Sequence, residues 1–388
     1  MNKNTKRILA IVGSSALVIG AFVSTSAQAA VSNVTLVFQG PLTGSDAETG
    51  QDELLGAKTA VDIYNATKPA VTVTLKTADD QGDGAVAGTV APGVASNKAV
   101  VGIIGPAYSG ASIASFPSYK SAGLAMVSPS ATRVTLTDPK SPDNGFPNFH
   151  RVLANDSIQA PALAKWAISG VTSPKVYLVD DTQAYSTGLR DYMMKQLAAQ
   201  GTVPVAKDQV PNNTSDYTSE VSKVKGSGAT VVIYCGYAPD AGKFLKALRD
   251  GGWTGQFASG DGSLVGTFIT GAGATNANGS HLTAAAVPFE LIATPDQLTA
   301  FTKATGLASP AGHTYVTETF NATNIFLQCI AKGKVTRPGI QSCISTGTFN
   351  LAGGKTISFS RYGEINGGAP VGLFSITNGA IKYEGLAK

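Results

Sequence analysis

The residues best suited to chemistry lie in six short loops, and each loop directly follows an apolar run of residues. Three loops in the first half of the chain carry small and hydroxyl-bearing residues, whereas three in the second half carry tyrosines and acids. Ligands of open α/β sheets bind beyond the carboxyl ends of the strands, so these loops are candidates for one binding site. The loops are Gly40–Gly44, Gly105–Gly110, Ser128–Thr132, Asp180–Tyr185, Cys235–Asp240 and Ser259–Gly262.

The two groups of loops offer complementary chemistry. Hydroxyl and backbone N–H groups around Ser109 and Thr132 suit a carboxylate. Tyr185, Tyr237 and Asp261 offer apolar walls with polar tips and a negative charge, which suit an ammonium group. A zwitterion needs both, so the six loops together favour an amino-acid-like ligand. Taken singly, each Ser or Thr could instead cap the following helix, and the acid in its Gly-rich loop could be a solvated turn residue.

Two series of apolar runs alternate with helix-like segments and must position these loops. Continuous apolar strands separated by amphipathic helices indicate parallel sheets covered on both faces, so the sequence predicts two doubly wound α/β lobes. The predicted strands are Val34–Phe38, Val71–Leu75, Ala99–Ile104, Leu124–Val127, Val176–Val179, Val203–Ala206, Thr230–Tyr234 and Gln256–Ala258. The predicted helices are Leu54–Tyr64, Ser112–Ser121, Ser186–Gln200, Tyr217–Gly226 and Pro239–Gly251.

The C-terminal part of the chain has a different character. Pro310–Lys332 predicts a helix, a shorter helix surrounds Cys343, and Thr356–Ser360 and Val371–Thr377 are β-like. Since no long Pro/Ser linker is present, we expect tight crossovers between the lobes. Cys329 and Cys343 flank a loop-like connection that a disulfide could close, with all three cysteines unpaired as the alternative. The remaining cysteine ends an apolar run, which indicates a small buried residue.

The first 29 residues have the pattern of a signal peptide. Met1–Arg7 is positively charged, Ile8–Val23 is apolar, and Ala27–Ala29 forms an A-x-A cleavage site. The apolar stretch is short for a membrane span, although an N-terminal anchor is the alternative interpretation. No cysteine stands near the cleavage site for lipid attachment, so we expect a soluble secreted or periplasmic protein.

The formal net charge of +4 arises mostly in that leader. Lys3, Lys6 and Arg7 are three of 29 basic residues, and the others nearly balance the 25 acidic ones. No Lys/Arg cluster remains to follow a phosphate backbone, which argues against a nucleic-acid partner. The hydrophobic fraction of 43% is typical of a folded globular protein, and 388 residues suffice for two domains.

An exported hydrolase is the main enzymatic alternative, and its motifs are missing. Ser109 lacks the flanking glycines of a nucleophile elbow, and the chain contains no H-E-x-x-H, C-x-x-C or P-loop motif. His150, His281 and His313 lie far apart in sequence, which leaves few general bases and no ligand-spaced metal site. We therefore expect a binding protein with no catalytic residues, no metal and no cofactor.

The mature chain resembles the periplasmic solute-binding proteins of ABC transporters, in their leucine/isoleucine/valine-binding branch. The resemblance rests on the order and spacing of short motifs. These are Gly40–Gly44 with Gly50 and Gly56–Ala57, Val101–Gly105 leading to Ser109, Met126–Thr132, Asp180–Gly188, Tyr234–Tyr237 with Pro239, and Gln256–Phe257 before Asp261. It implies a type I periplasmic binding protein fold with three crossover strands. The implied N-terminal lobe is residues 31–151 plus 287–362, and the C-terminal lobe is residues 152–286 plus 363–388.

The resemblance also implies roles for individual residues. Ser109 and Thr132 match positions that hold the ligand carboxylate, Ser130 matches one whose carbonyl accepts from the ammonium, and Asp261 matches an acid facing that ammonium. Tyr185, Tyr237 and Tyr315 match aromatic walls. The full implied ligand-binding set is Thr49, Tyr108, Ser109, Ser130, Ala131, Thr132, Tyr185, Tyr237, Asp261 and Tyr315.

Three departures from the family pattern concern the ligand. Thr49 stands where branched-chain-specific members carry an aromatic residue, Tyr108 replaces a cysteine of the family's first-lobe disulfide, and Asp261 is one methylene shorter than the usual Glu. The resemblance implies a monomer that captures a small amino acid, aliphatic or branched-chain, and delivers it to an ABC permease, its only membrane contact. A ligand sensor of the same fold that binds another small carboxylate or amide is the alternative.

Overall fold

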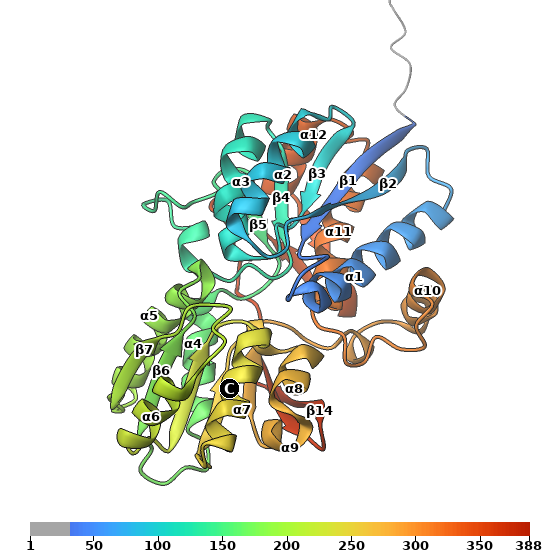
Figure 1. Cartoon of the computed structure of the whole chain (residues 1–388). Coiled ribbons are helices and arrows are strands. Elements are labelled where there is room, and N and C mark those ends of the chain that lie inside the picture. The colour runs from blue at the N-terminus through green and yellow to red at the C-terminus, as the bar shows by residue number, and fades with distance from the viewer. Residues whose placement is uncertain (1–31) are drawn as a thin grey trace, which may run out of the picture. The chain divides into compact units, whose positions relative to one another are not determined.

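Two sheets of mainly parallel strands organise the chain, and helices cover both (Figure 1). The structure is a computed structural model and describes residues 32–388, so the predicted signal peptide lies outside the described residues. The first sheet is entirely parallel, in the order β2-β1-β3-β4-β5. Its strands are β1 (Asn33–Gly40), β2 (Thr72–Asp79), β3 (Val100–Ile104), β4 (Ala125–Ser128) and β5 (Phe149–Arg151).

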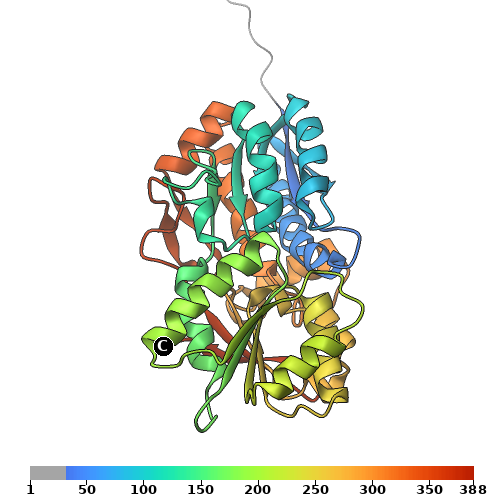
Figure 2. The same cartoon turned by 60° about the vertical axis from the view of Figure 1, so that its left-hand side comes forward.

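The second sheet has the order β14-β13-β10-β9-β8-β6-β7 and ends in an antiparallel hairpin. Figure 2 shows that hairpin, in red, beside the green and yellow strands of the same sheet. The strands are β6 (Val176–Asp180), β7 (Ala206–Gln209), β8 (Val231–Cys235), β9 (Gln256–Ser259), β10 (His281–Ala284), β13 (Gly372–Thr377) and β14 (Ala380–Leu386). A separate small ribbon pairs β11 (Thr348–Asn350) with β12 (Thr356–Ser358).

Helices from distant parts of the sequence cover each sheet. The helices of the first sheet are α1 (Ala47–Ala66), α2 (Gly84–Ser96), α3 (Ser109–Ser121), α10 (Pro295–Thr305), α11 (Val316–Ala331) and α12 (Arg337–Thr346). Those of the second sheet are α4 (Asp156–Ala167), α5 (Ala184–Ala199), α6 (Thr218–Gly226), α7 (Ala238–Asp250), α8 (Gly266–Ala272) and α9 (Ala274–Ala277). Within the described residues, no helix combines the length and the apolar character that crossing a membrane needs.

The chain passes three times between the two sheets, after β5, after β10 and after β12. This arrangement confirms the predicted α/β class with two doubly wound lobes. The connecting segments, residues 152–155, 285–288 and 359–371, have little ladder pairing of their own. The residue at which each lobe begins and ends, as proposed from the sequence, stays a prediction.

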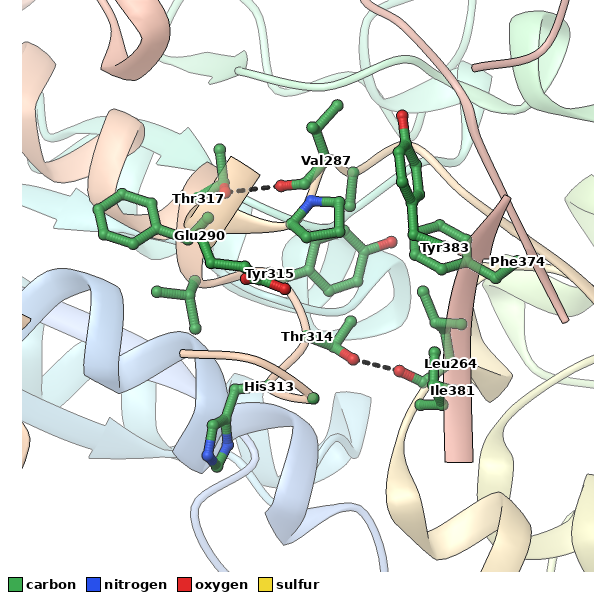
Figure 3. Close-up of a pocket in the computed structure, with 15 residues that line it drawn as sticks. Leu264, Val287, Glu290, His313, Thr314, Tyr315, Thr317, Phe374, Ile381 and Tyr383 are labelled. Atoms are coloured by element: carbon green, nitrogen blue, oxygen red, sulfur yellow. Dashed lines mark hydrogen bonds between the residues drawn. The ribbon is translucent and has the colours of Figure 1, made fainter. Parts of the chain in front are cut away.

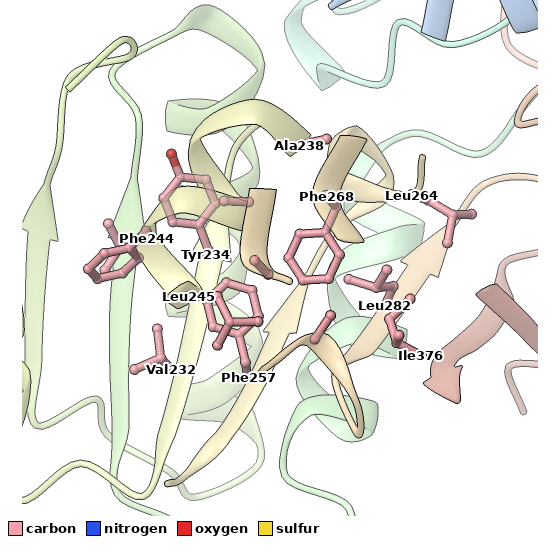
Figure 4. Close-up of a cluster of buried hydrophobic side chains, with 14 of the residues drawn as sticks. Val232, Tyr234, Ala238, Phe244, Leu245, Phe257, Leu264, Phe268, Leu282 and Ile376 are labelled. Carbon is pink, nitrogen blue, oxygen red and sulfur yellow. The ribbon is translucent and has the colours of Figure 1, made fainter. Parts of the chain in front are cut away.

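Strand β8 shows how one strand serves two cores. Val232 and Tyr234 point into a cluster with Phe244, Phe257 and Phe268, which Figure 4 shows between the sheet and helices α7 and α8. Val231, Ile233 and Cys235 belong to the opposite cluster with α4 and α5. Successive side chains of a strand point to opposite faces, so a strand covered on both faces must be apolar throughout.

Close contact between α1 and α11 depends on a glycine. A Cβ atom added at Gly56 would stand 2.2 Å from the carbonyl oxygen of Val316 and 2.8 Å from the backbone nitrogen of Phe320. Any side chain there would force the helices apart. Because Thr49 lies on α1 and Tyr315 directly precedes α11, this contact also sets the distance between two predicted site residues.

Several predicted elements differ from the structure. The last long helix begins at Val316 and not at Pro310, because residues 310–315 form turns that end in a left-handed residue, Tyr315 (φ 61°). Strand β7 lies three residues after its predicted position, since Val203 is 78% exposed and is not a core residue. Helices α2, α4 and α10 and strands β10 and β14 were not predicted, and both α2 and α4 contain an internal proline that masks the helical pattern.

Cys329 on α11 and Cys343 on α12 form a disulfide across a separation of 14 residues, while Cys235 is free and buried. Closing a loop of this size stabilises a protein by about 3 kcal/mol, mainly by restricting the unfolded chain.

We therefore expect the Cys329→Ser/Cys343→Ser double variant to lose about 3 kcal/mol of unfolding free energy, measured by urea denaturation. Dithiothreitol should lower the stability of the wild type to the level of the double variant and leave the double variant unchanged. A reductant effect on both proteins would contradict this assignment.

Candidate ligand-binding site

Eight of the ten predicted ligand residues line one small cavity at the carboxyl ends of the two sheets. Gly262, which the sequence analysis did not name as a ligand residue, is a further lining residue. Ala131 and Thr132 do not line the cavity and are buried beside it. The eight are Thr49, Tyr108, Ser109, Ser130, Tyr185, Tyr237, Asp261 and Tyr315.

Loops and helix N-termini position these side chains, as the parallel-sheet geometry requires. Tyr108 and Ser109 stand at the N-terminus of α3, directly after β3. Tyr185 and Tyr237 stand at the N-termini of α5 and α7, after β6 and β8. Asp261 follows β9 in a single 3₁₀ turn, Asp261–Ser263. Because all these strands end at the same edge of their sheets, residues far apart in sequence converge on one cavity.

The carboxyl group of Asp261 is the best-bonded group of the site. Its Oδ1 accepts hydrogen bonds from the Tyr185 hydroxyl (2.7 Å) and the Gln159 amide (2.5 Å), and its Oδ2 accepts from the Tyr315 hydroxyl (2.5 Å). Burial raises the pKa of Asp261, while these three donors oppose that increase. Three donors from α4, α5 and the start of α11 therefore hold one acid in a fixed orientation.

Aromatic rings fill most of the space around this acid. Tyr108 and Tyr237 stack face to face with ring centroids 4.2 Å apart and an interplanar angle of 9°, and Tyr185 lies 5.1 Å from Tyr237. Tyr108 also donates to Asp46 (3.1 Å). The remaining cavity measures about 20 Å³, which is enough for about one water molecule. An amino acid is larger, so the rings and the lobes must move to admit one.

Hydrogen bonds between the lobes hold this closed arrangement. Glu48 on α1 accepts from both the backbone N–H (2.6 Å) and the hydroxyl (2.5 Å) of Thr267 on α8. Arg133 donates to the Ala184 carbonyl and to the Thr187 hydroxyl (3.2 Å) on α5. None of the residues in these two contacts lines the cavity. The Tyr315–Asp261 hydrogen bond also joins the lobes, and both of its residues do line the cavity.

A second cavity of about 80 Å³ lies on the other side of Tyr315, beside the chain connection that follows β10 (Figure 3). Its lining includes Val287, Phe374 and Tyr383, and Figure 3 shows the hydrogen bond from Thr314 to the Leu264 carbonyl at its edge. Tyr315 lines both cavities and therefore lies between the candidate ligand site and this second space, whose lining also includes Glu290, His313 and Thr317.

Helix α4 contributes two groups that the sequence analysis missed. Gln159 bonds Asp261, and Asp156 is a fully buried acid at the first position of the helix. A signal for α4 exists in the sequence. Asn155 caps the helix by accepting from the Ser157 N–H (3.0 Å), and the buried residues that follow have helical spacing. They are Gln159, Ala160, Leu163, Ala164 and Ala167.

The three histidines lie in separate environments. His313 Nδ1 stands 2.6 Å from Asp52 Oδ1, and that carboxylate raises the pKa of His313. His281 stacks on Trp166, and burial lowers the pKa of His150 to about 4. Among the residues that the structure describes, no three His, Cys, Asp or Glu side chains are grouped as metal ligands.

A family model described as periplasmic binding protein matches residues 33–379. The chain is 31% identical over 264 residues to Leu/Ile/Val-binding protein homolog 3 of Brucella melitensis, which covers 66% of this chain and 68% of the relative. Two solved structures share the fold. They are a leucine-binding protein, LivK, of Thermotoga maritima (22% identity, TM-score 0.78, 92% of this chain and 99% of the other) and LivJ of Streptococcus pneumoniae with isoleucine (22% identity, TM-score 0.78, 91% and 98%).

The Glu48–Thr267 contact provides a test of how closure is stabilised. Hydrogen bonds to a charged group contribute about 1.5–3 kcal/mol, and here they join the two lobes without lining the cavity. We expect Glu48→Ala to shift the protein toward an open form, which small-angle X-ray scattering would detect as a larger radius of gyration. Glu220→Ala, which removes an acid on α6 of one lobe only, is the control. An unchanged radius of gyration for Glu48→Ala would show that the Glu48–Thr267 contact does not hold the lobes together.

Proposed function

The chain belongs to the periplasmic binding protein family, and we propose that it is an extracytoplasmic solute-binding protein that closes around a small amino acid and delivers it to an ABC permease. The nearest support for the ligand class comes from the relative of Brucella melitensis, which is a Leu/Ile/Val-binding protein homolog. The predicted signal peptide agrees with this location. The protein acts as a monomer, without catalysis and without a cofactor.

One observation carries the proposal: an oriented acid and a set of hydroxyl groups line the same enclosed cavity. Asp261 lies on one lobe, whereas Ser109 and Ser130 come from the other. An α-amino acid carries its ammonium and its carboxylate on the same carbon atom, so in a narrow cavity it can contact both walls at once. Closing the lobes around it removes water, which strengthens every electrostatic contact that it makes.

The carboxylate of the ligand binds at the N-terminus of α3. The Ser109 hydroxyl accepts from the Arg133 N–H (3.3 Å), so its own hydrogen remains available to donate. Unpaired backbone N–H groups of the first helical turn add a partial positive charge there. Thr132, whose buried hydroxyl has no partner, supplies a second donor once the loop after β4 adjusts.

The ammonium group binds toward Asp261. Tyr185, Tyr315 and Gln159 now occupy the acceptor positions of this carboxylate, and an ammonium would displace or share them. The Ser130 carbonyl provides a neutral acceptor, because the Ser130 hydroxyl is already bonded to the Ala107 carbonyl (2.8 Å). Asp261 thus supplies the negative charge that attracts the ammonium group, and the Ser130 carbonyl orients that group by accepting one of its hydrogen bonds.

The side-chain end of the ligand faces Thr49, Tyr108 and Tyr315. Thr49 is much smaller than an aromatic residue, but the Tyr108 ring lies across the same part of the cavity. These walls present mainly carbon, which favours an aliphatic side chain over a charged one. We therefore propose a branched-chain or smaller aliphatic amino acid, with a ligand sensor of the same fold as the second candidate.

A hydrolase is not favoured, because Ser109 has no base beside it. Its hydroxyl hydrogen-bonds a backbone N–H, whereas His281 and His313, within the described chain, bond Trp166 and Asp52. A serine nucleophile needs a base within hydrogen-bond reach.

Isothermal titration calorimetry of the mature protein against the twenty amino acids tests the function. A thermal-shift screen of the same twenty amino acids comes first and should show a higher melting temperature with at least one aliphatic amino acid. Calorimetry should then show saturable binding of that amino acid at one site. Binding of small acids or amides without any amino acid would contradict the proposed ligand class. Turnover of ester or amide substrates that a Ser109→Ala variant loses would contradict the proposal.

Asp261→Ala should reduce amino-acid affinity by about 30-fold or more, since removing one partner of a buried charged contact costs about 2–5 kcal/mol. Asp250→Ala is the matched control, because that acid pairs with Lys246 on an exposed face of α7 (2.5 Å). Calorimetry should show wild-type affinity for the control. Equal affinities of Asp261→Ala and the wild type would remove Asp261 from the site.

A further inference from the structure

A group of buried oxygen atoms without hydrogen-bond partners adjoins the candidate ligand site. Both carboxyl oxygens of Asp156, the side-chain amide oxygen of Gln159 and the Thr132 hydroxyl are buried and make no hydrogen bond of normal length. The Thr132 hydroxyl faces the Asp156 carboxyl closely enough to oppose the increase in its pKa. Three of these four atoms belong to groups that accept hydrogen bonds, and buried acceptors are rarely left without a donor. Of the four atoms, only the Thr132 hydroxyl can donate to an ionised Asp156, so the ionised form of this acid is short of donors.

Asp156 is fixed at the centre of this group by its backbone. Its N–H donates to the Thr132 carbonyl (3.0 Å), and its side chain is completely buried. Asn155, not Asp156, caps helix α4. One turn later, Gln159 donates to Asp261 (2.5 Å), so α4 connects the unpaired acid to the bonded one. Neither capping nor an ion pair accounts for a carboxyl group in this position.

Charged groups from several elements act on Asp156. Asp261 after β9 disfavours its ionised form, whereas Arg151 on β5 and Arg133 after β4 favour it. Four further groups lie within its field, and burial keeps them neutral by raising their pKa values. They are Tyr185 and Tyr192 on α5, Cys235 on β8 and Tyr237 before α7. Arg151 already bonds the Ala131 and Arg133 carbonyls and lies 3.0 Å from Glu364. Burial dominates and raises the pKa of Asp156 to about 8, so this acid carries its proton at neutral pH.

We propose that Asp156 is a second acid of the ligand site, which holds a proton until the ligand's ammonium group arrives and then releases it, so that amino-acid capture is coupled to proton release. An ammonium supplies both the missing donors and a positive charge next to two acids. The O–H bond of Asp156 breaks, the proton passes to the solvent, and the ammonium keeps its own three protons. This inference rests on the proposed function.

The direction of the pH dependence follows from linkage. A group that loses a proton on binding makes binding tighter as pH rises toward the pKa of the free protein, by up to tenfold per pH unit for one proton. For Asp156 that range ends near pH 8. A neutral amide at this position cannot release a proton and should remove the effect.

The experiment is calorimetric titration with L-leucine between pH 6 and pH 8.5, repeated in two buffers of different ionisation enthalpy to count protons. For the wild type we expect release of about one proton at pH 7 and a Kd that falls as pH rises. Asp156→Asn should release far less and bind with a nearly constant Kd. The Kd of Asp156→Asn divided by the Kd of the wild type should therefore rise from about one at pH 6 to about ten or more at pH 8. A merely structural role would change the Kd by the same factor at every pH.

Two further outcomes keep the inference separate from the proposed function. Wild-type protein that binds no amino acid would contradict the proposed function, whereas leucine binding without proton release would overturn only the role of Asp156. If Asp156→Asn does not fold, the wild type is titrated with 4-methylpentanoate, which is leucine without its amino group. That compound should bind without proton release. Release equal to that with leucine would overturn the inference.

Discussion

The arrangement depends on one constraint: a carboxyl group, Asp261, is enclosed between two lobes and must be satisfied there. Burying an unpaired charge costs more than most proteins can tolerate, so a buried acid requires donors or a cation. Tyr185, Gln159 and Tyr315 supply the donors, and they come from three separate elements. Helices α4 and α5 already pack against each other in one lobe, whereas Tyr315 comes from the other lobe, so the acid joins the two lobes. A bound cation would replace these donors at the same atoms, which links ligand capture directly to the contacts that close the protein.

The parallel sheets explain why such a site forms at this place. A parallel strand is followed by a crossover helix, so each βα loop lies at the same edge of the sheet and presents unpaired N–H groups from the helix that follows. Tyr108, the N-cap residue of α3, and Tyr237, the N-cap residue of α7, occupy equivalent positions in the two lobes. Stacking of Tyr108 on Tyr237 joins these equivalent positions across the cleft. The site is thus a property of two sheet edges facing each other.

The class of fold and the loops around the cavity could be predicted from local patterns, whereas Thr49 and Tyr315 were singled out only through the family resemblance. Apolar runs such as Val231–Cys235 and the loops after them are recognisable without tertiary information. The missed elements depend on context. Helix α4 contains Pro161. Strand β7 lacks an apolar run, since the exposed Val203 and Val205 precede it, and it is a strand because it pairs with β6. Gln159 and Asp156 were missed with their helix, and no local signal marks either as part of the site. Only the tertiary arrangement brings α4 against the loop after β4.

Under the proposed function, Tyr315 is the residue through which the size of the site can change. It is a bulky residue in a left-handed backbone conformation (φ 61°), which ordinarily costs about 1–3 kcal/mol and persists only where the surrounding structure enforces it. The hydrogen bond from its hydroxyl to Asp261 holds the ring over the candidate ligand cavity, while a second cavity four times as large lies beside it. The other aromatic residues of the candidate ligand cavity have no comparable empty space beside them, because Tyr108 and Tyr185 both pack against Tyr237. When an ammonium competes for Asp261, Tyr315 loses its anchor, and its ring is the wall that can yield to the ligand's side chain.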